Sequence, residues 1–74
     1  MTPLLLPSEI LSMSAQAARL LVESGDGDGA LLYLALLECG GDGDKAAARL
    51  RWQEARLRPA WERLAGLGLA QPPS

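Results

Sequence analysis

The sequence of 74 residues has no histidine and no phenylalanine, and it has a single cysteine. Without histidine, the chain lacks the usual general base near neutral pH and the commonest metal ligand. The one cysteine, Cys39, cannot form an internal disulfide or a cysteine-rich zinc site, and an unpaired thiol fits a reducing cytoplasm. We therefore expect a cytoplasmic protein that is not an enzyme and that holds no metal or cofactor.

Residues that favour strands are scarce. Valine, isoleucine and threonine occur once each, whereas leucine occurs 16 times and alanine 12 times. Leucine and alanine favour helices, so the chain should be mainly α-helical. At 7.8 kDa it forms one small domain, and such a domain buries only ~60% of its unfolded surface. With this many leucines exposed, we expect either a partner, such as a second copy in a homo-oligomer, or a missing continuation of the chain.

Long hydrophobic runs are also missing. The longest, residues 30–37, has eight residues, far fewer than the ~20 that cross a bilayer. The first seven residues lack the basic region and the long apolar stretch of a secretory signal. No membrane partner is therefore expected.

The remaining pattern predicts about four helices. Ser14 caps the first over residues 15–23, and Gly25 ends it in a left-handed conformation. Asp28 is expected to cap the second over residues 29–39, which is apolar almost all round and so should lie at the centre of the domain. Asp42 or Asp44 caps the third over residues 45–50.

A fourth helix over residues 54–65 follows a short break at residues 51–53, which makes a helix-turn-helix arrangement. Pro59 allows two interpretations. If the helix starts at Gln53, the proline lies about two turns inside it and removes one backbone donor. If the helix proper starts at Arg58, Pro59 takes the favoured first-turn position.

The two ends of the chain predict short β segments. Three leucines between Pro3 and Pro7 read as an extended edge segment, and Leu69-Ala70 can begin a second strand. We expect residues 3–7 to lie against that strand and to form part of a homodimer contact. The expected interface residues are Leu4, Leu5, Leu6 and Leu69. Residues 1–70 would form the domain, and residues 71–74 the start of a linker or tail.

Charge divides the chain into two halves. Residues 1–44 contain seven acidic residues and one arginine, a balance of −6, whereas residues 45–74 contain six basic and two acidic residues, a balance of +4. The basic half could contact DNA phosphates, or the two halves could attract each other within the fold or in a dimer. The candidate DNA-binding residues are Lys45, Arg49, Arg56, Arg58 and Arg63.

Two Asp-Gly clusters suggest calcium loops, but both lack residues that an EF-hand requires. Counted from Ser24, the twelfth position is Ala35 instead of a bidentate glutamate. Counted from Asp42, the sixth position is Ala47 instead of glycine. We interpret the clusters as turns and helix caps. No serine has a histidine to activate it, so neither a small-molecule substrate nor a catalytic residue is predicted.

Four segments together resemble a known family. They are residues 30–37 (ALLYLALL) with Gly40-Gly41, residues 46–52 (AAARLRW), residues 60–64 (AWERL) and residues 67–69 (LGL). This pattern is similar to the N-terminal winged-helix domain of DnaD-like primosomal proteins, over residues 14–70. The resemblance implies a winged helix that self-associates and assembles with the proteins of bacterial replication initiation.

The leading hypothesis is therefore a non-enzymatic assembly or oligomerisation module of a DnaD-like primosome protein, with weak non-specific DNA binding as an additional property. The alternative is a winged-helix transcriptional regulator that binds DNA through the basic helix 54–65.

Overall fold

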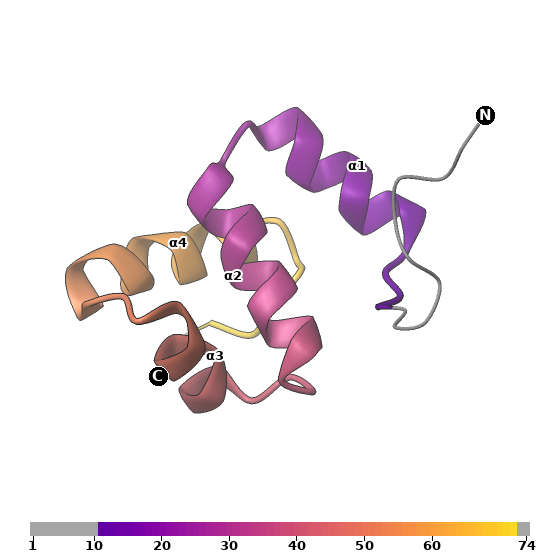
Figure 1. The fold of residues 1–74 in the computed structure, drawn as a ribbon. Helices are drawn as coiled ribbons and strands as arrows, with labels where there is room; N and C mark the ends of the chain where they lie inside the picture. Colours follow the sequence, from indigo (N-terminus) through magenta and orange to yellow (C-terminus); the bar gives the residue numbers. More distant parts are fainter. Residues whose placement is uncertain (1–10, 73–74) are drawn as a thin grey trace, which may run out of the picture.

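A computed structural model describes residues 11–72 of the chain, which form four helices and no strand. They are α1 (Ala15–Ser24), α2 (Gly27–Glu38), α3 (Gly43–Leu50) and α4 (Glu54–Gly66). In Figure 1, α2 crosses the middle of the molecule and α1 runs outward from its N-terminal end. Helix α2 contacts each of the other three helices. The prediction of a mainly α-helical chain with a central second helix is thus confirmed.

Local capping explains where the helices begin. The Ser14 side chain accepts a hydrogen bond from the Ala17 amide at 3.0 Å, and Gly25 ends α1 with a φ of 66°. Asp42 caps α3 by accepting hydrogen bonds from the amides of Asp44 and Lys45. Each of these caps supplies a partner for a backbone amide that has none inside the helix.

The predicted cap of α2 is wrong. Asp26, not Asp28, is the N-cap, and its carboxylate accepts a hydrogen bond from the Gly29 amide at 3.1 Å. The reason is that α2 begins at Gly27, two residues earlier than predicted, which places Asp28 inside the first turn. An acidic residue there still interacts favourably with the helix dipole.

Helix α4 contains Pro59 in its interior. The helix begins at Glu54, and the Gln53 carbonyl accepts hydrogen bonds from the amides of Arg56 and Leu57. Pro59 is therefore the sixth residue of α4, and the interpretation in which the helix starts at Arg58 is wrong. The alternative that places the proline deep in the helix is the one found, at the cost of one backbone donor.

The predicted C-terminal strand is also wrong. Leu69 and Ala70 form a bend after α4 instead of a strand. Gly68 has a φ of 77°, which turns the chain back, and the Leu69 amide donates to the Leu64 carbonyl at 3.0 Å. These contacts fold the segment onto the end of α4. The other predicted β segment, which contains Leu4, Leu5 and Leu6, lies outside the described residues.

The core lies where α2, α3 and α4 meet. Leu32, Ala46 and Ala60 are fully buried and Leu64 is 1% exposed. Small side chains on α3 and α4 allow close approach to α2, and Gly43 allows the start of α3 to approach Trp61 of α4. A side chain at Gly43 would overlap the ring of Trp61, so glycine is required where α3 begins.

Candidate functional site

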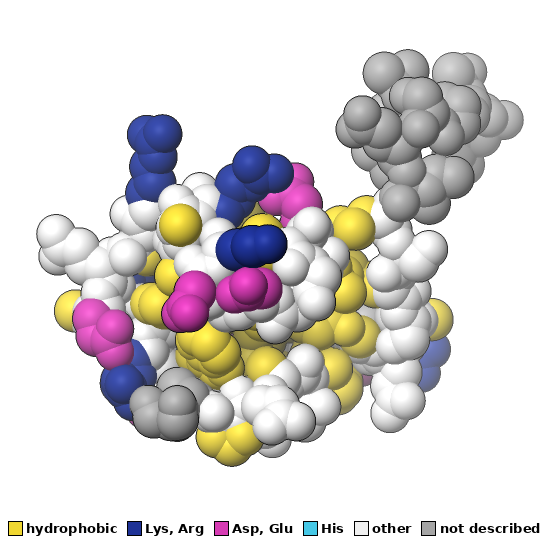
Figure 2. Space-filling model, turned by 90° about the horizontal axis from the view of Figure 1, so that it is seen from below, with side chains coloured by type: hydrophobic (Ala, Val, Ile, Leu, Met, Phe, Trp, Pro, Cys, Tyr) yellow, Lys and Arg dark blue, Asp and Glu magenta, His cyan; other side chains and the backbone are white. Residues whose placement is uncertain are grey.

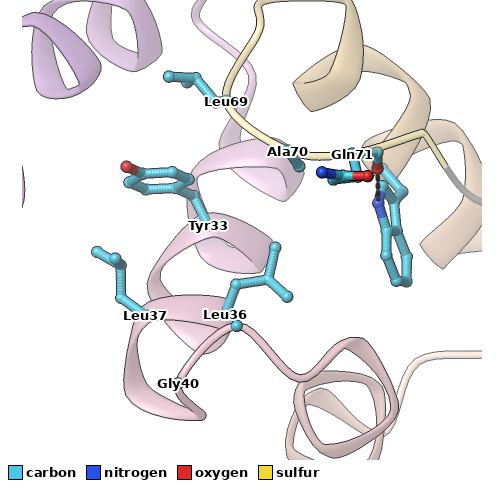
Figure 3. Close-up of a pocket in the computed structure, with 9 residues that line it drawn as sticks. Tyr33, Leu36, Leu37, Gly40, Leu69, Ala70 and Gln71 are labelled. Carbon is cyan, nitrogen blue, oxygen red and sulfur yellow. Dashed lines mark hydrogen bonds between the residues drawn. The ribbon is translucent and has the colours of Figure 1, made fainter.

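An apolar groove lies between α2 and the segment that follows α4. It encloses about 400 Å³. One wall is formed by Tyr33, Leu36 and Leu37 of α2, and the other by Leu69, Ala70 and Gln71 (Figure 3). Tyr33 is the only ionisable side chain among the described residues that line it. The groove therefore offers apolar contact area and no acid–base pair.

Trp61 holds the outer wall of this groove in place. Its indole Nε1 donates a hydrogen bond to the Gln71 carbonyl at 2.6 Å, drawn as the dashed line in Figure 3. The same ring packs against the start of α3 at Gly43. Trp61 thus joins three parts of the chain, and the position of Leu69 in the groove depends on it.

Two bidentate ion pairs join the N-terminal end of α2 to α4. Both carboxylate oxygens of Asp26 accept hydrogen bonds from the Arg63 guanidinium, one of them at 3.1 Å. Arg56 donates to both oxygens of Asp28, at 3.1 and 2.9 Å, and its guanidinium also lies 4.1 Å from the centre of the Trp52 ring. Paired donors of this kind fix orientation as well as charge.

Two further ion pairs involve the remaining arginines of the candidate DNA-binding set. Arg49 of α3 donates to Glu38 at the end of α2, at 2.7 Å. Arg58 donates to Glu54 one turn earlier in α4, at 2.9 Å. Four of the five candidate DNA-binding residues therefore contact a carboxylate of the chain itself. Lys45, the fifth, lies exposed in the first turn of α3.

These ion pairs change the titration of the carboxylates. Hydrogen bonds from Arg63 lower the pKa of Asp26, and those from Arg56 lower the pKa of Asp28. The Arg49 guanidinium likewise lowers the pKa of Glu38. In each case the arginine stabilises the ionised carboxylate, so all three acids stay charged well into the acidic range.

The sequence contained one signal for this arrangement. The opposite charges of the two halves predicted contact with phosphates or attraction between the halves, within the fold or in a dimer. Within the fold, three ion pairs join the acidic half to the basic half. Which acid meets which arginine could not be predicted, because the partners lie 11 to 37 residues apart. The groove was missed entirely, since its walls are far apart in the sequence.

Two leucines of α2 remain uncovered on the side away from the core. Leu31 is 47% exposed and Leu34 is 42% exposed. Figure 2 shows hydrophobic side chains gathered in the middle of one face of the molecule, with acidic and basic side chains near them. Contiguous exposed apolar surface of this kind is typical of protein interaction sites.

Within residues 11–72, no group of three or more histidine, cysteine, aspartate or glutamate side chains is placed to hold a metal ion. In the same residues, no helix combines the length and the apolar character that crossing a bilayer requires. Cys39, the only cysteine, is half-buried at the end of α2 and packs against the core.

Comparison with known proteins gives no match to a protein-family model, to a curated protein sequence or to a solved structure.

Proposed function

We propose that this chain is a non-enzymatic assembly module that self-associates, as the resemblance to the N-terminal domain of DnaD-like replication proteins implies. The observation that carries the proposal is that most charged side chains of the basic half are paired within the molecule, whereas apolar surface is exposed. The arginines of α3 and α4 contact carboxylates within the molecule, whereas Leu31, Leu34 and the groove beside Leu69 face outward. Surfaces of this type associate by burying apolar area.

The order of the helices supports the winged-helix part of the proposal. Helices α3 and α4 are separated by the three residues 51–53, and Arg51 takes a left-handed conformation with a φ of 58°. Two helices joined by a turn of this length support the helix–turn–helix part of the proposed winged helix. Replication-initiation proteins of the primosome remain the partners that the resemblance implies.

Sedimentation velocity over the micromolar range tests self-association. We expect the sedimentation coefficient to rise with concentration toward that of a dimer. A strict monomer at every concentration would overturn the proposal. Deletion of residues 2–7 and substitution of Leu69 by serine test the predicted interface of Leu4, Leu5, Leu6 and Leu69, because either change should weaken association if those residues contribute.

The competing function, DNA binding through α4, makes a different prediction. A protein that contacts phosphates loses affinity steeply as salt increases. We expect at most weak, non-specific binding of duplex DNA, because Arg56 and Arg63 already contact Asp28 and Asp26. Tight binding with a salt dependence that falls in Arg56→Ala or Arg63→Ala, but not in Arg19→Ala on α1, would favour the regulator instead.

A further inference from the structure

The uncovered side of α2 carries four residues in a regular stripe. Gly27, Leu31, Leu34 and Glu38 are all exposed. At 100° per residue they fall within about 60° of the helix circumference, and the buried Gly29 and Leu32 lie on the other side of the helix. We call these four residues the α2 stripe. Leu37, beside the stripe, also lines the apolar groove, so the stripe borders further apolar surface.

The spacing of the α2 stripe is the same in both directions. Steps of four, three and four residues separate its members, which is the spacing of the seam positions in a coiled coil. When two such stripes run antiparallel around a twofold axis, Leu31 of each copy lies opposite Leu34 of the other. Glu38 of each copy then lies opposite Gly27 of the other. A twofold contact requires this kind of self-complementary surface.

Charge favours the antiparallel direction over the parallel one. In a parallel pair the two Glu38 carboxylates would lie side by side. Glu38 already accepts a hydrogen bond from Arg49 through Oε1. In an antiparallel pair the carboxylate also meets the N-terminal end of the other α2, where the helix dipole is positive. Gly27 has open space around its Cα, which lets the carboxylate approach. The acids near that end, Asp26 and Asp28, already contact Arg63 and Arg56.

We propose that α2 pairs antiparallel with α2 of a second copy of this chain, with Leu31 of each copy against Leu34 of the other. This inference rests on the proposed self-association and specifies its surface. A 12-residue helix is about 18 Å long. A contact along one side of so short a helix buries less surface than the ~1,200–2,000 Å² that stable interfaces bury. The dimer is therefore weak and forms reversibly as concentration rises.

Disulfide trapping measures the direction of the pairing. Cys39→Ala removes the native thiol, and Leu31→Cys and Leu34→Cys are then made separately, one of them with a tag that changes its mass. The two proteins are mixed in equal amounts, oxidised mildly and analysed by mass spectrometry. Random collision gives as much mixed disulfide as the two symmetric disulfides together. The antiparallel seam should give more mixed product than both symmetric products combined.

Val22→Cys in the same Cys39→Ala background is the control, because Val22 is 80% exposed and lies on α1. It should give no preferred product with either α2 variant. Symmetric or statistical products from the α2 variants, or no disulfide at concentrations where the parent protein dimerises, would overturn the antiparallel seam. Sedimentation of the parent protein separates the two proposals. A dimer without the mixed preference contradicts only the seam, whereas a strict monomer contradicts both.

A second measurement does not depend on cysteine chemistry. Leu34→Glu places a charge in the seam and should raise the dimer dissociation constant at least about tenfold, which corresponds to about 1.4 kcal/mol. Val22→Glu, the same kind of change at a more exposed position on α1, should leave the dissociation constant unaltered. Both positions are exposed, so far-ultraviolet circular dichroism should show unchanged helix content. An unaltered dissociation constant in Leu34→Glu would contradict the seam.

Discussion

The two sides of α2 have similar compositions and opposite surroundings. Leu31 and Leu32 are adjacent in the sequence, yet Leu32 is fully buried against the neighbouring helices and Leu31 is 47% exposed. The covered side meets α3 and α4, and Asp26 at the N-terminal end of α2 contacts Arg63 of α4. Burial of a leucine in this chain is therefore set by which helices reach it, and hydrophobicity alone does not decide it.

The largest expected effect is the loss of stability when the buried leucine of α2 is shortened, compared with the same change at the exposed leucine beside it. Leu32→Ala leaves a cavity in the core and should lower the free energy of unfolding by about 2–5 kcal/mol. Leu31→Ala removes the same atoms from an exposed position and should cost less than ~1 kcal/mol. Urea denaturation at a concentration where the protein is monomeric measures both. Equal losses of unfolding free energy in the two variants would contradict the different burial of Leu31 and Leu32.

Replacing a glycine by alanine adds a methyl group and so tests the contrast between covered and uncovered surface. Gly43→Ala drives a Cβ into the Trp61 ring and should destabilise the protein by about 1–3 kcal/mol. Gly27→Ala places its Cβ in open space on the uncovered side, where a gain of about 0.4–1 kcal/mol is expected. Thermal melting shows the direction of each change. A neutral Gly43→Ala would contradict the close contact between α3 and α4.

Two substitutions of Asp26 separate its two roles. Asp26→Asn keeps an oxygen that can cap α2 but removes the charge that holds Arg63. Asp26→Ala removes both, and loss of the cap should add about 0.5–2 kcal/mol of destabilisation. Chemical denaturation of the two variants gives this difference. Variants of equal stability would show that the ion pair, and not the cap, accounts for the contribution of Asp26.

The smallest expected effect is a dependence on pH. Because arginines lower the pKa of Asp26 and Asp28 below the ordinary value of 3.8, the folded state binds protons less readily than the unfolded state. Their contribution to stability is thus fully present above that ordinary value and is lost as pH falls through the lowered pKa values. Urea melts between about pH 5 and about pH 2 should show this loss, and Arg63→Gln should reduce it.

The sequence predicted features that depend on near neighbours. Ser14 and Gly25 were assigned correctly as a helix cap and a helix stop, and Asp42 was one of two candidates for the cap of α3, because each acts within three residues along the chain. The wrong choice of Asp28 as the cap of α2 also arose from near neighbours, since two aspartates in a glycine-rich turn offer nearly equivalent caps. The structure places Asp26 at the cap, where it also contacts Arg63, and Asp28 inside the first turn, where it contacts Arg56.

Features that depend on distant residues could not be predicted. Leu69-Ala70 has the composition of a strand start, but two hydrogen bonds to the preceding helix hold the segment as a bend. The Leu69 amide donates to the Leu64 carbonyl, and the Trp61 indole donates to the Gln71 carbonyl. The apolar pattern of α2 correctly predicted a central helix. It could not predict which side stays uncovered, because leucine occurs all round the helix.

The short connections between the helices have a consequence for folding kinetics. Two to four residues join each helix to the next, so most helix contacts close small loops, and helical domains of this kind fold in microseconds to milliseconds. The ion pair of Asp26 with Arg63 instead spans 37 residues. Because such a contact forms after the local helices, weakening it should mainly accelerate unfolding and leave the folding rate almost unchanged.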